Sequence, residues 1–135
     1  MTLTAHNHKR IAAFVRIATR EILSARLISQ AAPEDAIFLL QQAVEKLVRA
    51  LVEAEEGVAG ITHNIGALCG LLPSAHPLQT QLRPLHELSI AATRYRYPTS
   101  GGNVFEYEGD ISAVIIEVDA LNASVIDYLK SRQLF

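Results

Sequence analysis

The chain has 135 residues, of which 50% are apolar and 19% are charged, and its formal net charge is -2. This length is that of one domain, so we expect a single domain over residues 1–135 and exclude a two-domain enzyme. The apolar fraction excludes a disordered segment, and the small negative charge gives no support to general nucleic-acid affinity.

The sequence predicts a cytoplasmic protein without a membrane span. Cys69 is the only cysteine, so no disulfide forms within the chain. The amino-terminal residues contain no continuous apolar core of the kind that a secretory signal needs. Charged residues interrupt every apolar run well before the roughly 18 residues that a membrane helix requires.

Two long amphipathic helices are predicted in the first half of the chain. The first covers about 7–29, because apolar residues recur there at steps of three and four: Ile11, Phe14, Val15, Ala18, Ile22 and Ala25. The second starts at Pro33-Glu34-Asp35, where a helix start tolerates proline and favours acids, and Gly57 ends it. Its apolar stripe is Ile37, Leu40, Val44, Leu47, Val48 and Leu51.

The second half predicts one short and two long helices. Thr62 is expected to cap the short helix, which ends at Pro73. A long helix is predicted over about 77–97 with a bend at Pro84, and 99–109 is predicted to be a loop. Asp110 caps the last long helix. The predicted fold is therefore all-α, an up-and-down helical bundle of four long helices and one short helix.

Charge is distributed unevenly along this bundle. Residues 1–30 contain one acid, Glu21, and five basic residues: Lys9, Arg10, Arg16, Arg20 and Arg26. Residues 97–129 contain acids and neither Lys nor Arg. The favoured interpretation is attraction between neighbouring helices across solvated faces, which contributes little per pair. The alternative is that Arg16 and Arg20 bind an anion.

Several kinds of chemistry find no support in the sequence. The glycine pairs lack the preceding strand and the spacing of phosphate-binding loops. The five histidines and Cys69 show no metal-ligand spacing, so we expect neither a metal nor a cofactor. Cys69 falls within the short apolar helix and the serines lie outside nucleophile contexts, which argues against covalent catalysis.

A polar cluster, Arg94-Tyr95-Arg96-Tyr97, precedes Pro98 at the end of the predicted fourth helix. Two guanidinium groups between two phenols suit phosphate binding together with base stacking. Capping of the last helical carbonyls by arginine explains the cluster equally well. On the second helix Gln42, Lys46 and Arg49 form one strip, for which a solvated face is the favoured interpretation.

Three groups of residues together resemble the HEPN domain family. They are Gln41-Gln42-Ala43-Val44-Glu45-Lys46-Leu47-Val48-Arg49-Ala50-Leu51, then Thr62-His63-Asn64-Ile65, then Arg96-Tyr97-Pro98 followed by Glu106-Tyr107-Glu108. The resemblance implies an all-α bundle that forms homodimers and works with a separate nucleotidyltransferase in two-gene modules. It also implies, for some members, metal-independent RNA cleavage as the toxin of a toxin–antitoxin pair.

The cleaving members use an Arg followed within a few residues by a His. Here no His occurs after His86, and the pair Arg83 and His86 is too closely spaced and has Pro84 between its members. No catalytic residue is therefore assigned, and we lean toward a protein that is not an enzyme. The resemblance carries over Lys46, His63, Arg96 and Tyr97 as nucleotide- or RNA-contacting residues, with Arg94 from the same cluster. In this interpretation Arg96 holds a phosphate, Tyr97 stacks on a base and His63 donates to an oxygen.

These residues also have structural interpretations. Glu45 would pair with an Arg or His inside the bundle, and Pro98 would only end a helix. The sequence therefore predicts a dimeric nucleotide- or substrate-binding module without chemistry of its own. A ribonuclease toxin with a displaced catalytic pair and a purely protein-binding bundle stay open as alternatives.

Overall fold

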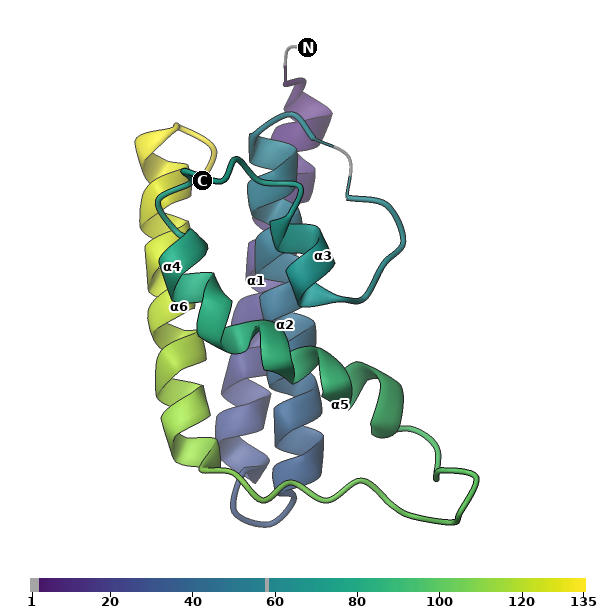
Figure 1. Cartoon of the computed structure of the whole chain (residues 1–135). Helices are drawn as coiled ribbons and strands as arrows, with labels where there is room; N and C mark the ends of the chain where they lie inside the picture. Colours follow the sequence, from purple (N-terminus) through teal and green to yellow (C-terminus); the bar gives the residue numbers. More distant parts are fainter. Residues whose placement is uncertain (1–2, 58) are drawn as a thin grey trace.

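The structure, a computed structural model, describes residues 3–57 and 59–135, with only the backbone of His6. The described residues form helices and no strand, so the predicted all-α class is confirmed. The elements in order are α1 (Ala5–Ile28), α2 (Pro33–Ala54), α3 (Ile65–Cys69), α4 (Gln79–Leu82), η1 (Arg83–Leu88), α5 (Ser89–Arg94) and α6 (Ile111–Ser131). Figure 1 shows α1, α2 and α6 side by side, with the short helices crossing them.

The three long helices begin where the sequence supplies their missing hydrogen-bond partners. Thr4 caps α1 through a capping box with Asn7, in which the side-chain oxygen of each residue accepts a hydrogen bond from the backbone N–H of the other. Pro33 occupies the first turn of α2, and the Asp110 carboxylate accepts from Ala113 at the start of α6. These three helix starts agree with the sequence patterns.

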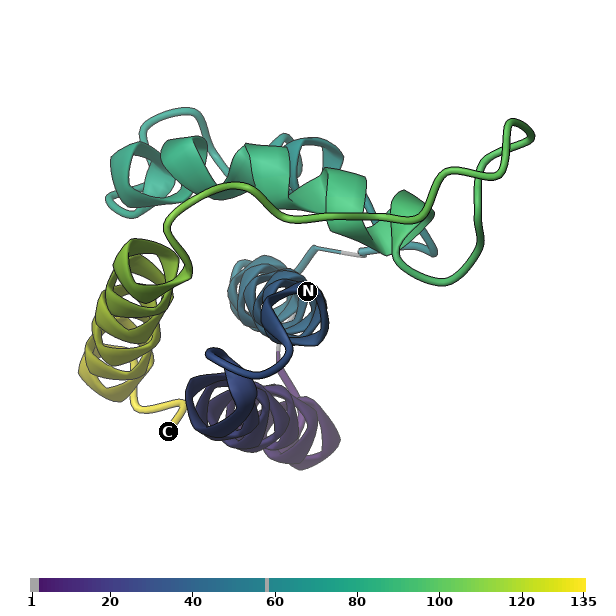
Figure 2. The same cartoon turned by 90° about the horizontal axis from the view of Figure 1, so that it is seen from below.

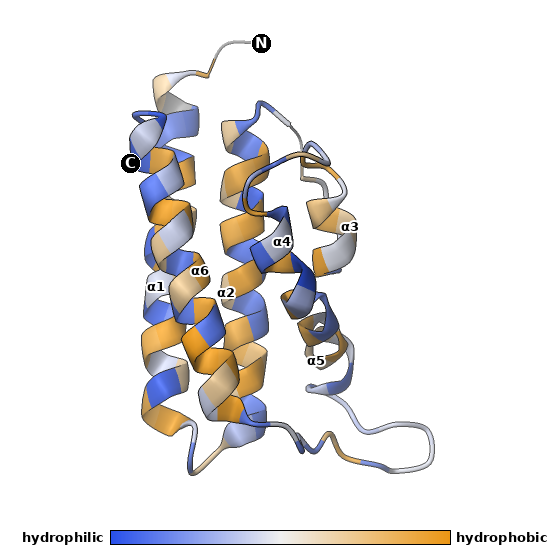
Figure 3. Ribbon diagram, turned by 60° about the vertical axis from the view of Figure 1, so that its left-hand side comes forward, coloured by the Kyte–Doolittle hydropathy of each residue, from blue (hydrophilic) through white to orange (hydrophobic). Residues whose placement is uncertain are grey.

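α2 is the central helix of the fold. Of its 22 residues, 13 are buried. This is more than the single apolar stripe of a surface helix contains, so other elements must pack against α2 on several sides. Figure 2 shows α2 between α1 and the row of short helices, with α6 beside α1. Figure 3 shows apolar residues along the whole length of α2. The fully buried side chains of the core include Ile11, Leu40, Leu47, Leu51, Leu121 and Leu129.

The predicted fourth long helix is a series of three short segments. α4, the 3₁₀ segment η1 and α5 together cover Gln79–Arg94. Pro84 lies in the first turn of η1, where it lacks an N–H and its ring would clash with a carbonyl four residues earlier in a continuous α-helix. The described residues therefore contain three long helices, and the remaining helical part is a segmented row that crosses α2 (Figure 1).

The predicted short helix is also shorter than expected. α3 is capped by Asn64, whose side-chain oxygen accepts from Ala67 N at 2.8 Å. Thr62 instead accepts from the backbone of Asn64, so it supports the turn that precedes the helix. Asn64 is a strong N-cap residue, and it lies two positions closer to the apolar run than Thr62 does.

The connection 95–110 contains neither helix nor strand, which confirms the loop predicted over 99–109. The helix predicted to reach about 97 ends earlier, at Arg94. It is tied to the start of α2, because the backbone N–H of Tyr107 donates to the Glu34 carboxylate at 2.8 Å. Phe105 and Tyr107 are half-buried against the core. This long segment therefore closes over the bundle near the first turns of α2.

The uneven charge is partly explained by contact between α1 and α6. Arg26 of α1 forms an ion pair with Asp119 of α6 at 3.0 Å, and both side chains are about half exposed. This contact agrees with the favoured interpretation of the uneven charge, which was attraction between neighbouring helices of opposite charge. Arg16 and Arg20 are exposed on α1 and form no ion pair within the described part of the chain. None of the described helices is long and apolar enough to cross a bilayer.

Buried His76 makes the stability of this fold depend on pH. Its ring packs against Tyr128, and its Nδ1 accepts from Leu78 N at 3.2 Å. Burial lowers the pKa of His76 from its ordinary value, an effect that the nearby Glu55 opposes. The folded state therefore favours the neutral ring, and acid shifts the balance toward the unfolded chain, which takes up the proton.

We predict that the melting temperature falls as the pH is lowered from about 7.5 through the ordinary histidine pKa of about 6.5. One such group contributes at most about 1.4 kcal/mol per pH unit. In His76→Gln, which cannot be protonated, the decline between these pH values should be shallower. Calorimetry at a series of pH values measures both slopes, and equal slopes would contradict this role of His76.

Candidate functional site

One face of α2 carries a row of side chains that contact the segments crossing it. Apart from the adjacent Gln41 and Gln42, its members follow one another at steps of three and four residues, so they share one side of the helix. We call this row the α2 polar face; it comprises Asp35, Phe38, Gln41, Gln42, Glu45 and Arg49. The segment 59–64 and the residues after α5 lie along it, as their contacts below show.

The Glu45 carboxylate binds the His63 imidazole on this face. Glu45 is 4% exposed, and its Oε1 lies 2.8 Å from His63 Nδ1. The His63 side chain is 71% exposed, and Gln41 Nε2 donates to its backbone carbonyl at 3.4 Å. The ring is thus held from the inside, and its Nε2 has no hydrogen-bond partner in the described structure. This leaves one ring nitrogen for a ligand.

Arg49 holds the segment that carries His63. Its two terminal nitrogens donate to the carbonyls of Gly60 and Thr62, at 2.7 and 2.6 Å. The sequence interpretation of Arg49 as part of a solvated strip missed this role. A signal was available, since Arg49 follows Glu45 by one helical turn and so faces the same crossing segment.

Arg96 reaches α2 about two turns before Glu45, the residue that binds the histidine ring. Its guanidinium lies over the Phe38 ring at 5.5 Å from the centroid, a cation–π geometry. Tyr95 stacks on the same ring with centroids 4.3 Å apart, and its hydroxyl donates to Asp35 at 2.7 Å. The hydrogen bond to Asp35 raises the pKa of Tyr95. Sequence reasoning did not single out Phe38 or Asp35.

Phe38, under the Arg96 guanidinium, and Glu45, which binds the His63 ring, are seven residues and so about two turns apart on α2. Two candidate residues that are distant in the sequence therefore lie along one helix face. Arg96 presents N–H donors, and the free Nε2 of His63 accepts a hydrogen bond when the ring is neutral and donates one when the ring is protonated.

The other three candidate residues lie differently. Lys46 is beside this face but is engaged with Glu21 of α1, with Nζ 2.9 Å from Oε2. Burial raises the pKa of Glu21, and the hydrogen bond from Lys46 counteracts that rise. Tyr97 is 76% exposed next to Arg96. Arg94 is exposed and lines a hollow on the side of the 99–108 segment, together with Glu106 and Glu108.

A hollow of about 240 Å³ lies beside His63. It is lined by Thr62, His63, Asn64, Ser89, Ala92 and Thr93, which are mostly hydroxyl-bearing and polar residues. Ligand pockets usually measure about 300–1,000 Å³, so this space suits one phosphate or one base edge more than a whole nucleotide.

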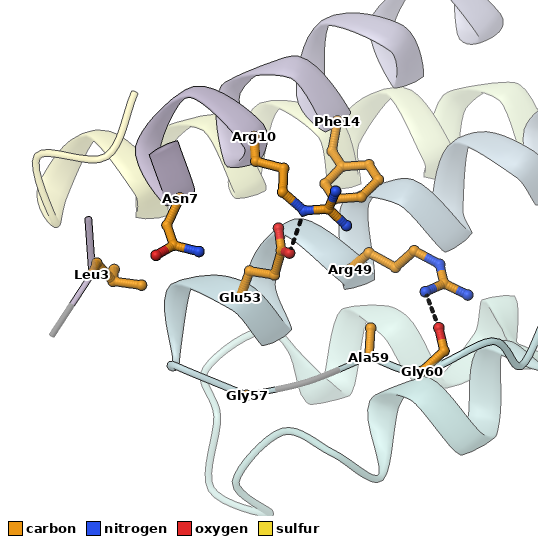
Figure 4. A pocket seen from close by; sticks show the side chains of 9 residues that line it. All are labelled: Leu3, Asn7, Arg10, Phe14, Arg49, Glu53, Gly57, Ala59 and Gly60. Carbon is orange, nitrogen blue, oxygen red and sulfur yellow. Dashed lines mark hydrogen bonds and ion pairs between the residues drawn. The ribbon is translucent and has the colours of Figure 1, made fainter. Parts of the chain in front are cut away.

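Figure 4 shows a second hollow, of about 230 Å³, at the other end of the α2 polar face. Arg10 donates from Nε to Glu53 at 2.6 Å and lies over Phe14, while Arg49 bonds to Gly60. The Arg10 guanidinium thus holds α1 against α2, and the Arg49 guanidinium holds Gly60 there. Within the described residues there is no group of three or more His, Cys, Asp or Glu side chains placed to hold a metal.

Comparison with known proteins gave one match. The model of a family described as the HEPN domain matches residues 11–119, which includes α2, the segment with His63 and the Arg96 region. No curated protein and no solved structure matches the chain.

The clamp formed by Arg49 leads to a prediction about the segment that carries His63. In Arg49→Ala the loss of two charge-assisted hydrogen bonds should increase backbone amide exchange over 59–64 by about ten-fold or more, equivalent to about 1.4 kcal/mol. Arg49→Lys should restore little, because an ammonium lacks the fork that reaches two carbonyls. Hydrogen exchange with Arg26→Ala as control tests this; unchanged rates in Arg49→Ala would contradict the clamp.

Proposed function

The chain belongs to the HEPN domain family, and on that premise we propose that it is a nucleotide-binding module with its site on the α2 polar face. The module acts as a dimer and presents the nucleotide, or an RNA end, to a separate nucleotidyltransferase. The chain itself contributes binding and no bond-breaking step.

The observation that carries this proposal is the placement of His63 and Arg96 on the same face of α2, where their side chains contact Glu45 and Phe38, about two turns apart. His63 is anchored by a buried carboxylate, so its orientation is set before a ligand arrives. Arg96 rests on Phe38 and keeps the edge of its guanidinium for a phosphate. Exposed Tyr97 adjoins Arg96 and offers a ring for base stacking.

Lys46 and Arg94 have secondary parts in this proposal. Lys46 reaches a phosphate only by leaving Glu21, so it would strengthen binding of a highly charged ligand. Arg94 points toward the acidic 99–108 segment and contributes to the positive charge around the site.

Binding is favoured over RNA cleavage for a chemical reason. No histidine follows Arg96, so this arginine has no partner in the cleaving Arg–His order. The pair Arg83 and His86 has that order, but its spacing is too short and Pro84 lies between the two residues. After Arg96, the first polar side chain that could replace the histidine is Asn103, which does not transfer protons near neutral pH.

We predict that one of ATP, GTP, other nucleoside triphosphates or short RNA raises the melting temperature in a saturable way. Arg96→Ala should weaken binding about 10- to 100-fold, because it removes a charge-assisted contact worth about 1.5–3 kcal/mol. His63→Ala should weaken it less, since its contact to the ligand is a single hydrogen bond. Thermal shift and calorimetric titration measure both effects.

Arg83→Ala is the matched control, because Arg83 is another exposed arginine at the start of η1. It should bind like the unmodified protein. If no ligand shifts the melting temperature, or if Arg96→Ala and Arg83→Ala weaken binding equally, the site is not on the α2 polar face.

A further inference from the structure

A groove of about 620 Å³ lies between α1 and the end of α6, and we call it the α1–α6 groove. Its apolar lining includes Ile17 of α1 and Ile126 of α6, which are half-buried, and Phe135, which is 44% exposed. Ligand pockets usually measure about 300–1,000 Å³, so this groove is large enough to hold a small molecule against an apolar surface.

Two arginines line the same groove. Arg16 and Arg20 are exposed and lie one helical turn apart on α1, so both side chains are on one side of the helix. Neither forms an ion pair within the described part of the chain. Glu21 follows Arg20, but its carboxylate is bonded to Lys46 of α2 at 2.9 Å. None of the described side chains that line the groove is acidic, so its positive charge is not compensated there.

The arginine pair favours an anion. Like charges one turn apart repel each other and destabilise a helix, and an anion bound between Arg16 and Arg20 removes that repulsion. A guanidinium group also presents a planar set of N–H donors that matches a carboxylate or a phosphate. The charged part of the ligand is therefore an acidic head group.

The rest of the groove favours an apolar ligand body. Besides the arginines, Thr19 is the polar residue among the described lining. Its hydroxyl donates to the Val15 carbonyl at 2.9 Å and accepts from Asn122 at 3.2 Å, so it is already engaged. A base, a sugar or a peptide backbone placed here would lose water without gaining hydrogen bonds, which is unfavourable.

We propose that the α1–α6 groove binds a single-chain anionic amphiphile, which is a long-chain carboxylate or an alkyl phosphate. Arg16 and Arg20 donate hydrogen bonds to the head group, and the tail lies along Ile17, Ile126 and Phe135, where it is removed from water. This second site is separate from the nucleotide site. The short helices that cross α2 lie on the opposite side of α2 from α1 (Figure 2).

A free amphiphile fits this surface better than a membrane does. Asp127 is exposed and directly follows Ile126, and Asp119 is about half exposed on the same helix. An anionic bilayer that covered the groove would also approach these carboxylates, which repel it. A single head group contacts the two arginines alone, so it gains their attraction without that repulsion.

The test uses dodecanoate below the concentration at which it forms micelles, with calorimetric titration as the measurement. We expect saturable binding of one molecule per chain. Dodecyltrimethylammonium has the same tail with a positive head group, and acetate has the head group without the tail. Each of these two should bind at least about ten-fold more weakly, because each lacks one half of the contact.

Substitutions separate the head-group contact from the tail contact. Arg16→Gln and Arg20→Gln should each weaken dodecanoate binding about 10- to 100-fold, because each removes charge-assisted hydrogen bonds at an exposed position. Phe135→Ala should weaken it through the loss of apolar contact. The matched control is Arg83→Gln, at an exposed arginine outside the groove, and it should bind like the unmodified protein.

Nuclear magnetic resonance of the isoleucine and leucine methyl groups locates the ligand. Shifts of Ile17 and Ile126 that saturate with the calorimetric affinity support the site. Equal shifts at exposed Ile61 and Leu71 would indicate general surfactant binding and overturn it.

Equal affinity for dodecanoate and dodecyltrimethylammonium also overturns the proposal, as does equal binding by Arg16→Gln and Arg83→Gln. Cosedimentation with phosphatidylglycerol vesicles is the remaining arm. If it depends on Arg16 and Arg20 while dodecanoate does not bind, the arginines serve a membrane surface and the amphiphile site is wrong.

Discussion

Glu45 lies on α2, the helix that is packed on several sides, and it is only 4% exposed. A buried carboxylate without a partner is costly, so its position requires a donor from another segment. His63 supplies that donor, and Arg49 holds the backbone just before it, at Gly60 and Thr62. The 59–64 segment, which has no regular structure, is thereby fixed against α2 at three points.

The same helix face organises the second half of the site. The Phe38 ring stacks on Tyr95 and attracts the Arg96 guanidinium, so the residues after α5 are held about two turns along α2 from Glu45 and the His63 ring. α2 can do this because its remaining sides are packed against α1, α6 and the row of short helices. A helix that is enclosed on several sides moves little, and it keeps the two side chains at a constant separation.

Local patterns in the sequence predicted the starts of α1, α2 and α6, because proline, capping residues and apolar spacing act over a few residues. The same patterns overestimated the helix around Pro84, where apolar spacing continues although the backbone hydrogen bonds do not. Of the site, the pairing of Glu45 with an Arg or a His was among the interpretations, and the structure shows Glu45 paired with His63, whose ring is exposed at the surface and not inside the bundle. The roles of Arg49 and Phe38 depend on which segments cross α2, and that tertiary information has no local signal.

The central claim is that one ligand contacts His63 and Arg96 together on the α2 polar face. It is tested most directly by nuclear magnetic resonance of the His63 ring nitrogens and the Arg96 guanidinium during titration with the nucleotide that stabilises the protein. The account predicts that both signals shift and saturate at the same ligand concentration. Shifts confined to α1 and α6, with both of these side chains unchanged, would contradict it.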